Sequence, residues 1–210
     1  MEKLELFHIH KSNQYDRKWE TGKIITVKEN FENGMSKRQK SFTTTIEMNT
    51  TTGMIEEEYH LLAARIMSKI VNKEIITRKE LQIVKYLIEK SYDVSYYANM
   101  FKREQALESC RQDKFKSLPS RLHSIFLTDE EGIGYWQEVI GKLDNYFIYR
   151  VEVEGNIFKT NEDLIPSESL DYIDTYNKAF KYWHPKFEGT RSYANEYLAQ
   201  GKIKVLEKLK

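Results

Sequence analysis

The residues best suited to chemistry lie in the segment Leu118 to Thr128, where a polar pair interrupts a short apolar run. Pro119 ends a long charged helix, and Arg121 and Ser124 follow it on a predicted strand. A core strand has no need of such a pair, so the pattern predicts a polar edge beside a cleft. An arginine next to a hydroxyl offers hydrogen-bond donors to an anionic group. The alternative is that Arg121 pairs with Glu104 or Glu108 of the preceding helix.

Two other short segments are read together with this one. Glu196 stands near the end of the chain, before Tyr197 and Leu198, and the alternative for it is a solvated acid that caps a turn. His8 and His10 share one face of a predicted strand and could chelate a metal. No acidic partner stands close to them in the sequence, so we expect no metal site.

Several other functional motifs are missing from the sequence. Gly132-Ile133-Gly134 falls inside a predicted helix and has no third glycine, whereas a dinucleotide-binding turn needs its glycines between a strand and a helix. There is no Walker A lysine motif and no His-Glu-x-x-His spacing. Cys110 is the one cysteine, which excludes a disulfide or a cysteine-based zinc site within the chain.

The composition predicts one sizeable domain of 210 residues with a balanced charge, because 33 Lys and Arg face 32 Asp and Glu. That balance favours neither nucleic acid nor membrane as a partner, although a local basic groove remains compatible with it. The N-terminus lacks the pattern of a signal peptide, and no apolar run reaches the roughly 20 residues of a membrane-spanning helix. We expect a cytoplasmic protein that does not bind membranes.

The predicted elements indicate an α+β fold. Strands are expected at 4–10 and 19–27, and residues 28–53 are expected to form a mobile polar loop. A block of three helices follows, expected at about 55–70, 77–88 and 96–115. The second half alternates, with strands expected at 121–128, 146–153, 157–159 and 202–206, a turn at 155–156, and helices at about 129–143 and 167–183.

A resemblance to a known superfamily rests on several short motifs taken in order. They are Phe7-His8-Ile9, Arg103-Glu104, Glu108-Ser109-Cys110-Arg111, Pro119-Ser120-Arg121, Ser124-Ile125-Phe126, Ala179 to Trp183, and Glu196-Tyr197-Leu198 with Gly201 and Val205. In this succession the chain resembles the ADP-ribosyltransferase superfamily. More narrowly, it is similar to small, poorly characterised bacterial and phage proteins of that kind, over nearly its whole length. The resemblance implies a split β-sheet core, with the helical block inserted between the N-terminal and central strands.

The chemistry that the resemblance implies is cleavage of NAD between nicotinamide and ribose, through a transition state like an oxocarbenium ion. Glu196 matches the catalytic glutamate, whose carboxylate would stabilise the developing positive charge. His8 matches a first-strand position that holds the ribose or pyrophosphate side of NAD, and otherwise is a strand histidine bonded to backbone. Arg121 and Ser124 match the middle motif, where an arginine fork suits the pyrophosphate.

Two aromatic residues are also implied as part of the NAD site. Phe126 matches a position that places an aromatic ring against nicotinamide, and its alternative is a core residue. Tyr182 would line the cleft, unless it only packs the last helix on the sheet together with Trp183. NAD is thus the expected substrate, and no metal is expected.

One departure from the superfamily concerns the acceptor. Arginine-modifying relatives carry an acid or glutamine two residues before the catalytic glutamate, where this chain has Ala194. We therefore expect a macromolecular acceptor other than arginine, with a nucleic-acid base preferred over a protein side chain. Lys37, Arg38 and Lys40 of the 28–53 loop are candidates to contact it.

These features predict an NAD-dependent ADP-ribosyltransferase that acts as a toxin or phage-defence effector. An antitoxin or inhibitor protein would be a further partner of such an effector. The alternative function is a binding or inhibitor module on the same fold that has lost the chemistry.

Overall fold

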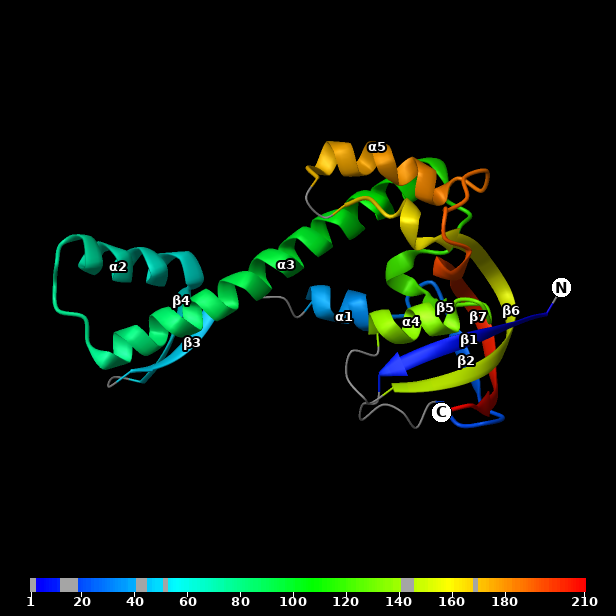
Figure 1. The fold of residues 1–210 in the computed structure, drawn as a ribbon, viewed down its shortest axis with the longest axis horizontal. Helices are drawn as coiled ribbons and strands as arrows, with labels where there is room; N and C mark the ends of the chain where they lie inside the picture. The colour runs from blue at the N-terminus through cyan, green and yellow to red at the C-terminus, as the bar shows by residue number, and fades with distance from the viewer. Residues whose placement is uncertain (1–2, 12–18, 41–44, 51–52, 141–145, 168–169) are drawn as a thin grey trace. The chain divides into compact units, whose positions relative to one another are not determined.

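The computed structural model describes residues 3–11, 19–40, 45–50, 53–140, 146–167 and 170–210. It is a mixed α+β structure built around a five-stranded antiparallel sheet (Figure 1). The chain divides into two compact units, residues 1–38 with 102–210, and residues 39–101. No helix in the described part of the chain is long and apolar enough to cross a membrane.

The smaller unit consists of a hairpin and helices. Strand β3 (Thr45–Thr50) pairs antiparallel with β4 (Gly53–Glu58), which leads into helix α2 (Tyr59–Val71). Helix α3 (Arg78–Lys114) begins in this unit and ends in the larger one. The sequence predicts two helices here with a break between them, and the single helix α3 corrects that prediction.

The larger unit contains the sheet. Its strands are β1 (Leu4–Lys11), β2 (Ile24–Val27), β5 (Ile125–Leu127), β6 (Tyr146–Asn161) and β7 (Asn195–Lys208). They lie in the order β1-β6-β7-β2, and β5 pairs with the part of β7 beyond β2. The residue after β5, Thr128, exchanges two backbone hydrogen bonds with Phe7 of β1. Strands β1, β6, β7 and β5 therefore form a closed circuit of hydrogen-bonded neighbours.

The inside of this circuit is an apolar core. Because successive strand residues face opposite sides, residues 149, 151 and 153 of β6 and residues 197, 199, 203 and 205 of β7 all point inward. Leu6, Trp19 and Val27 complete this core. The intervening residues, Leu198 and Phe158 among them, face the other side of the sheet.

The outer face of the paired strands β6 and β7 is covered by helix α5 (Tyr172–Trp183) and the end of α3, which lie next to each other in Figure 1. Trp183 is fully buried there and donates its indole N–H to the Leu107 carbonyl of α3 at 2.8 Å. Helix α5 begins at an N-cap, Asp171, whose carboxylate accepts from the backbone of Asp174. The side chains at the start of β7 that face this layer, those of Glu196 and Leu198, are therefore buried beneath it.

Two glycines explain why β6 is one strand. The sequence predicts a turn at Gly155 and Asn156, but β6 runs through them without interruption. Gly155 lies opposite Gly201 of β7, and a Cβ on Gly155 would lie 2.1 Å from the Gln200 carbonyl oxygen. The glycine therefore permits close approach of two backbones within a sheet rather than a reversal of the chain.

The predicted loop 28–53 is wrong in part, because helix α1 (Gly34–Lys40) and strand β3 lie in it. Asn33 caps α1 by accepting hydrogen bonds from the backbone of Met35 and Ser36, both at 3.0 Å. Lys37, Arg38 and Lys40 thus belong to a helix. Residues 41–44 and 51–52 of this predicted loop, and residues 141–143 of the helix predicted at about 129–143, lie outside the described residues.

The remaining elements differ from the prediction in their bounds. The strand expected at 121–128 is a 3-10 turn, η2 (Arg121–His123), followed by β5. Helix α4 (Ile133–Ile140) follows, and the 3-10 turns η3 (Glu162–Leu164) and η4 (Ser192–Ala194) come after β6 and before β7. The final strand, expected at 202–206, already begins at Asn195, so Glu196 lies within β7 and not before it.

Candidate functional site

A buried ionic cluster forms around Arg121. Its Nε donates to the Glu104 carboxylate of α3 at 2.8 Å. Its Nη1 donates to the Glu196 carboxylate of β7 and to the Tyr182 hydroxyl of α5, and the same hydroxyl donates to Glu196. Arg121 is 4% exposed and Glu196 3% exposed, so the solvated-acid alternative for Glu196 is wrong. The pairing of Arg121 with Glu104, expected as an alternative, is present.

The Pro119-Ser120-Arg121 motif fixes the arginine through its serine. The Ser120 hydroxyl accepts from the Leu122 backbone at 3.2 Å, which caps η2, and donates to Glu108 of α3 at 2.9 Å. Burial raises the pKa of Glu108, but hydrogen bonds from Arg111 and Ser120 outweigh it and hold this pKa below its usual value. The motif therefore ties the start of η2 to α3, one residue before Arg121.

Glu196 and Tyr182 reach the cluster from the sheet and its covering helix. Glu196 shares a face of β7 with Leu198, and that is the face on which α5 packs. Burial raises the pKa of the Tyr182 hydroxyl well above its usual value, and the Glu196 charge adds to the rise. Tyr182 stays a neutral donor to Glu196, and its ring also packs α5 on the sheet as the alternative predicts.

Charge in the cluster is shared between two acids and two arginines. Burial alone would lower the pKa of Arg121, but Glu104 and Glu196 reverse this and raise it well above the usual value. Arg103 adds a second cation, with its Nη2 at 3.2 Å from Glu104. A buried carboxylate needs such partners because removing it from water costs on the order of several kcal/mol.

Phe126 contacts the cluster directly, and His8 is connected to it through the Phe126 backbone. The Arg121 guanidinium lies 5.1 Å from the Phe126 ring centre and 5.0 Å from that of Tyr182, within cation–π distance of both rings. His8 Nδ1 lies 3.0 Å from the Phe126 carbonyl oxygen, which can only accept, so Nδ1 carries the proton. Nε2 of a neutral His8 ring is then an acceptor.

The His8 ring is neutral at physiological pH. Burial lowers its pKa to about 3, although the bond to the Phe126 carbonyl acts in the opposite direction. The ring stacks on Trp19 with centroids 4.0 Å apart and an interplanar angle of 14°. His8 is thus held by a backbone carbonyl, as the alternative for it predicts, while one ring nitrogen keeps its lone pair.

Ser124 ends the turn that carries Arg121 and has an unused hydroxyl. It is fully buried, and its Oγ has no hydrogen-bond partner among the described residues. Its carbonyl oxygen and that of Arg121 both accept from the Asn33 side chain, at 3.1 and 2.6 Å. A buried hydroxyl without a partner costs free energy, and a ligand atom could satisfy it.

Glu162 is a second acid near Glu196 that the sequence analysis missed. It follows β6, whose end pairs with the start of β7. Tyr135 donates its hydroxyl to Glu162, and the Arg191 Nη2 lies 3.4 Å away. Desolvation raises the pKa of Glu162, Arg191 opposes this, and the nearby Glu196 charge adds to the rise. The pairing of β6 with β7 places Glu162 near Glu196. Ala194, at the position where arginine-modifying relatives carry an acid or glutamine, is fully buried.

Four of the six predicted site residues thus meet at one place, namely Arg121, Phe126, Tyr182 and Glu196. Ser124 is the C-cap residue of η2, the turn that carries Arg121. His8 joins them through the Phe126 carbonyl. Within the described residues, no group of three or more His, Cys, Asp or Glu side chains is arranged to hold a metal ion.

A comparison with protein-family models gives a match over residues 6–210, to a family described as protein of unknown function, DUF2441. The chain belongs to the DUF2441 family. The match contains every residue of the cluster around Arg121. A search of curated proteins gave no match for this DUF2441 chain.

Proposed function

We propose that the protein is an ADP-ribosyltransferase that transfers ADP-ribose from NAD to a macromolecular acceptor, with a nucleic-acid base preferred. In this reaction the bond between nicotinamide and C1′ of the ribose breaks, and neutral nicotinamide leaves. The acceptor nucleophile bonds to C1′ and gives up a proton. Such an activity suits a toxin or phage-defence effector, with an antitoxin or inhibitor protein as a further partner.

One observation carries the proposal, namely the convergence of Glu196 with Arg121, Tyr182 and Phe126. These side chains come from a strand, a 3-10 turn, a helix and another strand, and they meet on the covered face of β7. The four residues match the positions that the superfamily uses for NAD. Their separation in the sequence makes a chance meeting of all of them a poor explanation.

Each residue has a role that its geometry supports. Glu196 would stabilise the positive charge that develops on the ribose, and Tyr182 would hold the carboxylate in place by donating to it. Arg121 would exchange Glu196 for the NAD pyrophosphate while Glu104 keeps its Nε side fixed. The His8 Nε2 can accept from a ribose hydroxyl, and the buried Ser124 hydroxyl can meet a polar atom of NAD.

Entry of NAD requires an opening step, because the side chains of Arg121 and Glu196 are only 5% and 4% exposed. Only the open molecules would bind NAD, so the apparent affinity would equal the affinity of the open form multiplied by the fraction of molecules that are open. The finer fold assignment, a split sheet of the ADP-ribosyltransferase type, is part of the same proposal. Its support is the place of helices α2 and α3, which lie between β2 and β5 in the sequence as that arrangement expects.

The test is release of nicotinamide from NAD by the wild type, by Glu196→Gln and by the control Glu207→Gln. Glu207 lies on the same strand with a side chain that is 45% exposed. We expect the first variant to lose about a hundredfold or more in rate and the control to lose nothing. Circular dichroism of each variant checks that the fold is kept. Equal rates for the wild type and Glu196→Gln would remove the proposed role.

A second candidate function is a binding or inhibitor module that has lost the chemistry. The ion pair between Arg121 and Glu196 favours it, because each side chain already binds the group that would have to interact with NAD. Calorimetry with NAD separates the two candidates. Binding without release of nicotinamide supports the module, and turnover that depends on Glu196 supports the enzyme.

A further inference from the structure

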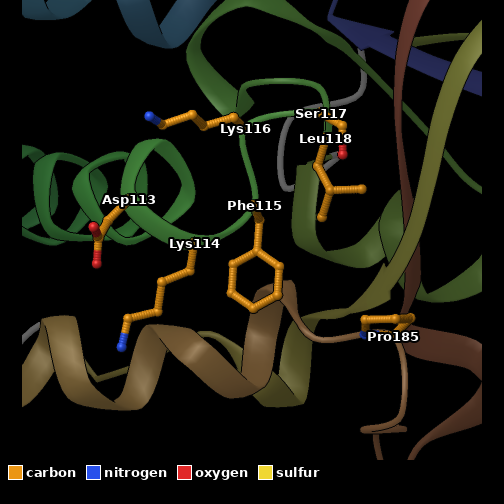
Figure 2. A pocket seen from close by; sticks show the side chains of 7 residues that line it. All are labelled: Asp113, Lys114, Phe115, Lys116, Ser117, Leu118 and Pro185. Carbon is orange, nitrogen blue, oxygen red and sulfur yellow. The ribbon is translucent and has the colours of Figure 1, made fainter.

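We propose that the open hollow between the end of α3 and the end of α5 binds single-stranded nucleic acid, with phosphates on its lysines and a base on its aromatic rings. The hollow is lined by residues 113–118 and Pro185 and has a volume of about 600 Å³ (Figure 2). Figure 2 shows the Phe115 ring and the Lys114 side chain pointing toward α5, whereas the Lys116 side chain extends away from that helix.

The wall of this hollow is held in a fixed shape. The Arg111 guanidinium donates to the carbonyl oxygens of Lys116 and Leu118, at 3.2 and 2.8 Å. Glu108 binds the same guanidinium through both of its oxygens, at 3.0 and 2.7 Å. Asn156 of β6 adds a bond to the Ser117 carbonyl at 2.8 Å. A surface that is already ordered loses less conformational entropy when a ligand binds.

Aromatic rings form a continuous group at this site. The Phe115 and Phe180 ring centres are 5.4 Å apart, and the His184 ring lies 5.1 Å from Phe180. Phe187 continues the group at 5.5 Å from His184 and is 42% exposed. An aromatic side chain that remains exposed beside packed rings offers a face on which an unpaired base can stack.

Positive charge surrounds these rings. The exposed lysines at 114, 116, 181 and 186 face two acids in the same segments, Asp113 and Glu188. Asp113 already accepts from the Tyr176 hydroxyl at 2.8 Å, and Lys114 lies 5.7 Å from the Phe180 ring centre. The chain as a whole is nearly balanced, with 33 basic and 32 acidic residues, so this excess is local. Its sign complements phosphate.

Together, lysines and aromatic rings favour a single strand over other anionic partners. A duplex presents phosphates but keeps its bases stacked, so the rings would gain nothing from it. An acidic peptide would use the lysines alone. The inference does not depend on NAD chemistry, since every group in it lies outside the cluster around Arg121.

The experiment measures fluorescence anisotropy of a labelled oligothymidylate of 20 nucleotides, without NAD, and compares it with a duplex and with polyglutamate. We expect the single strand to bind more tightly than either. Lys116→Glu combined with Lys186→Glu should weaken binding at least tenfold and reduce the salt dependence by about two phosphate contacts. The control is Lys202→Glu with Lys204→Glu, two exposed lysines of β7, and it should bind as the wild type does.

A second variant tests the rings. Phe187→Ala should weaken the single strand by about tenfold and leave any duplex binding unchanged, because only an unpaired base can stack on that ring. Binding that is equal for all three anionic probes, or that survives reversal of the two lysines, would overturn the inference. So would a loss of the same size in the β7 control.

Discussion

Arg121 and Glu196, separated by 75 residues in the sequence, form an ion pair that is almost closed to solvent. The pair joins the turn before β5 to the start of β7, and Tyr182 connects both to α5. Two buried carboxylates share this one arginine, so the cluster is a place where a single substitution leaves a charge without its partner. Stability and the proposed activity therefore depend on the same contacts.

The first prediction concerns removal of that cation. Arg121→Met leaves Glu104 and Glu196 without their shared partner and should lower the free energy of unfolding by about 3–5 kcal/mol. Urea titration of the wild type and the variant measures this. Arg150→Met is the control, because Arg150 forms surface pairs with a side chain that is 39% exposed, and its loss should stay within about 1 kcal/mol. Equal losses would show that the cluster contributes no more than a surface pair.

The second prediction concerns pH and His8. Its folded pKa of about 3 lies below the usual 6.5, so the unfolded chain takes up this proton first as pH falls. Stability attributable to His8 is complete above pH 6.5 and declines below it, by up to roughly 3 kcal/mol at pH 4. His8→Gln should remove this slope between pH 6.5 and 4. Free energies of unfolding measured across that range test it, because acids with unchanged surroundings contribute equally to both proteins.

The third prediction concerns Gly201. Its φ of +134° disfavours any other residue, and an added Cβ would lie 2.3 Å from the Glu154 carbonyl oxygen. Gly201→Ala should therefore cost at least about 2 kcal/mol. Gly134→Ala is a matched control, since Gly134 lies in α4 with nothing within 4 Å of an added Cβ. We expect that change to be neutral or to stabilise by up to about 1 kcal/mol. Thermal melts of both variants decide the matter.

The fourth prediction concerns Asn33, which joins α1 to the segment that carries Arg121 and Ser124. Asn33→Ala leaves two carbonyl oxygens and two backbone N–H groups without this partner and should cost about 1–3 kcal/mol. Asn177→Ala, at an exposed position of α5, should change the free energy of unfolding by no more than roughly a few tenths of a kcal/mol. Urea midpoints of the two variants provide the comparison. A harmless Asn33→Ala would contradict the anchoring role.

Local signals in the sequence were sufficient for several elements. The apolar and aromatic character of residues 4–10 predicts β1, and Pro119 marks the end of α3 within a few residues. The convergence of residues 121, 126, 182 and 196 was expected only through the resemblance. No local sequence pattern predicts that the turn before β5, the last helix and the start of β7 lie together in the fold.

Errors arose where long-range pairing decides the structure. Gly155-Asn156 has the composition of a turn, yet Gly201 opposite makes it part of a strand. The polar residues 28–53 gave no apolar period, although Asn33 fixes α1 through carbonyls about 90 positions away, at 121 and 124. Glu162 became visible as a neighbour of Glu196 only because β6 and β7 are aligned at their ends. Each error concerns a partner distant in the sequence.

The closed circuit of strands has a consequence for how the protein is made. Strand β1 bonds on one edge to β6 and on the other to Thr128, so both of its partners are synthesised long after it. During translation β1 has no partner until Thr128 is made and lacks its β6 partner until residues 146–153 are made, so its edges are exposed to other chains for that time. Slow folding from non-local strand pairing follows, and crowding of nascent chains should penalise this protein more than a helical one of equal length.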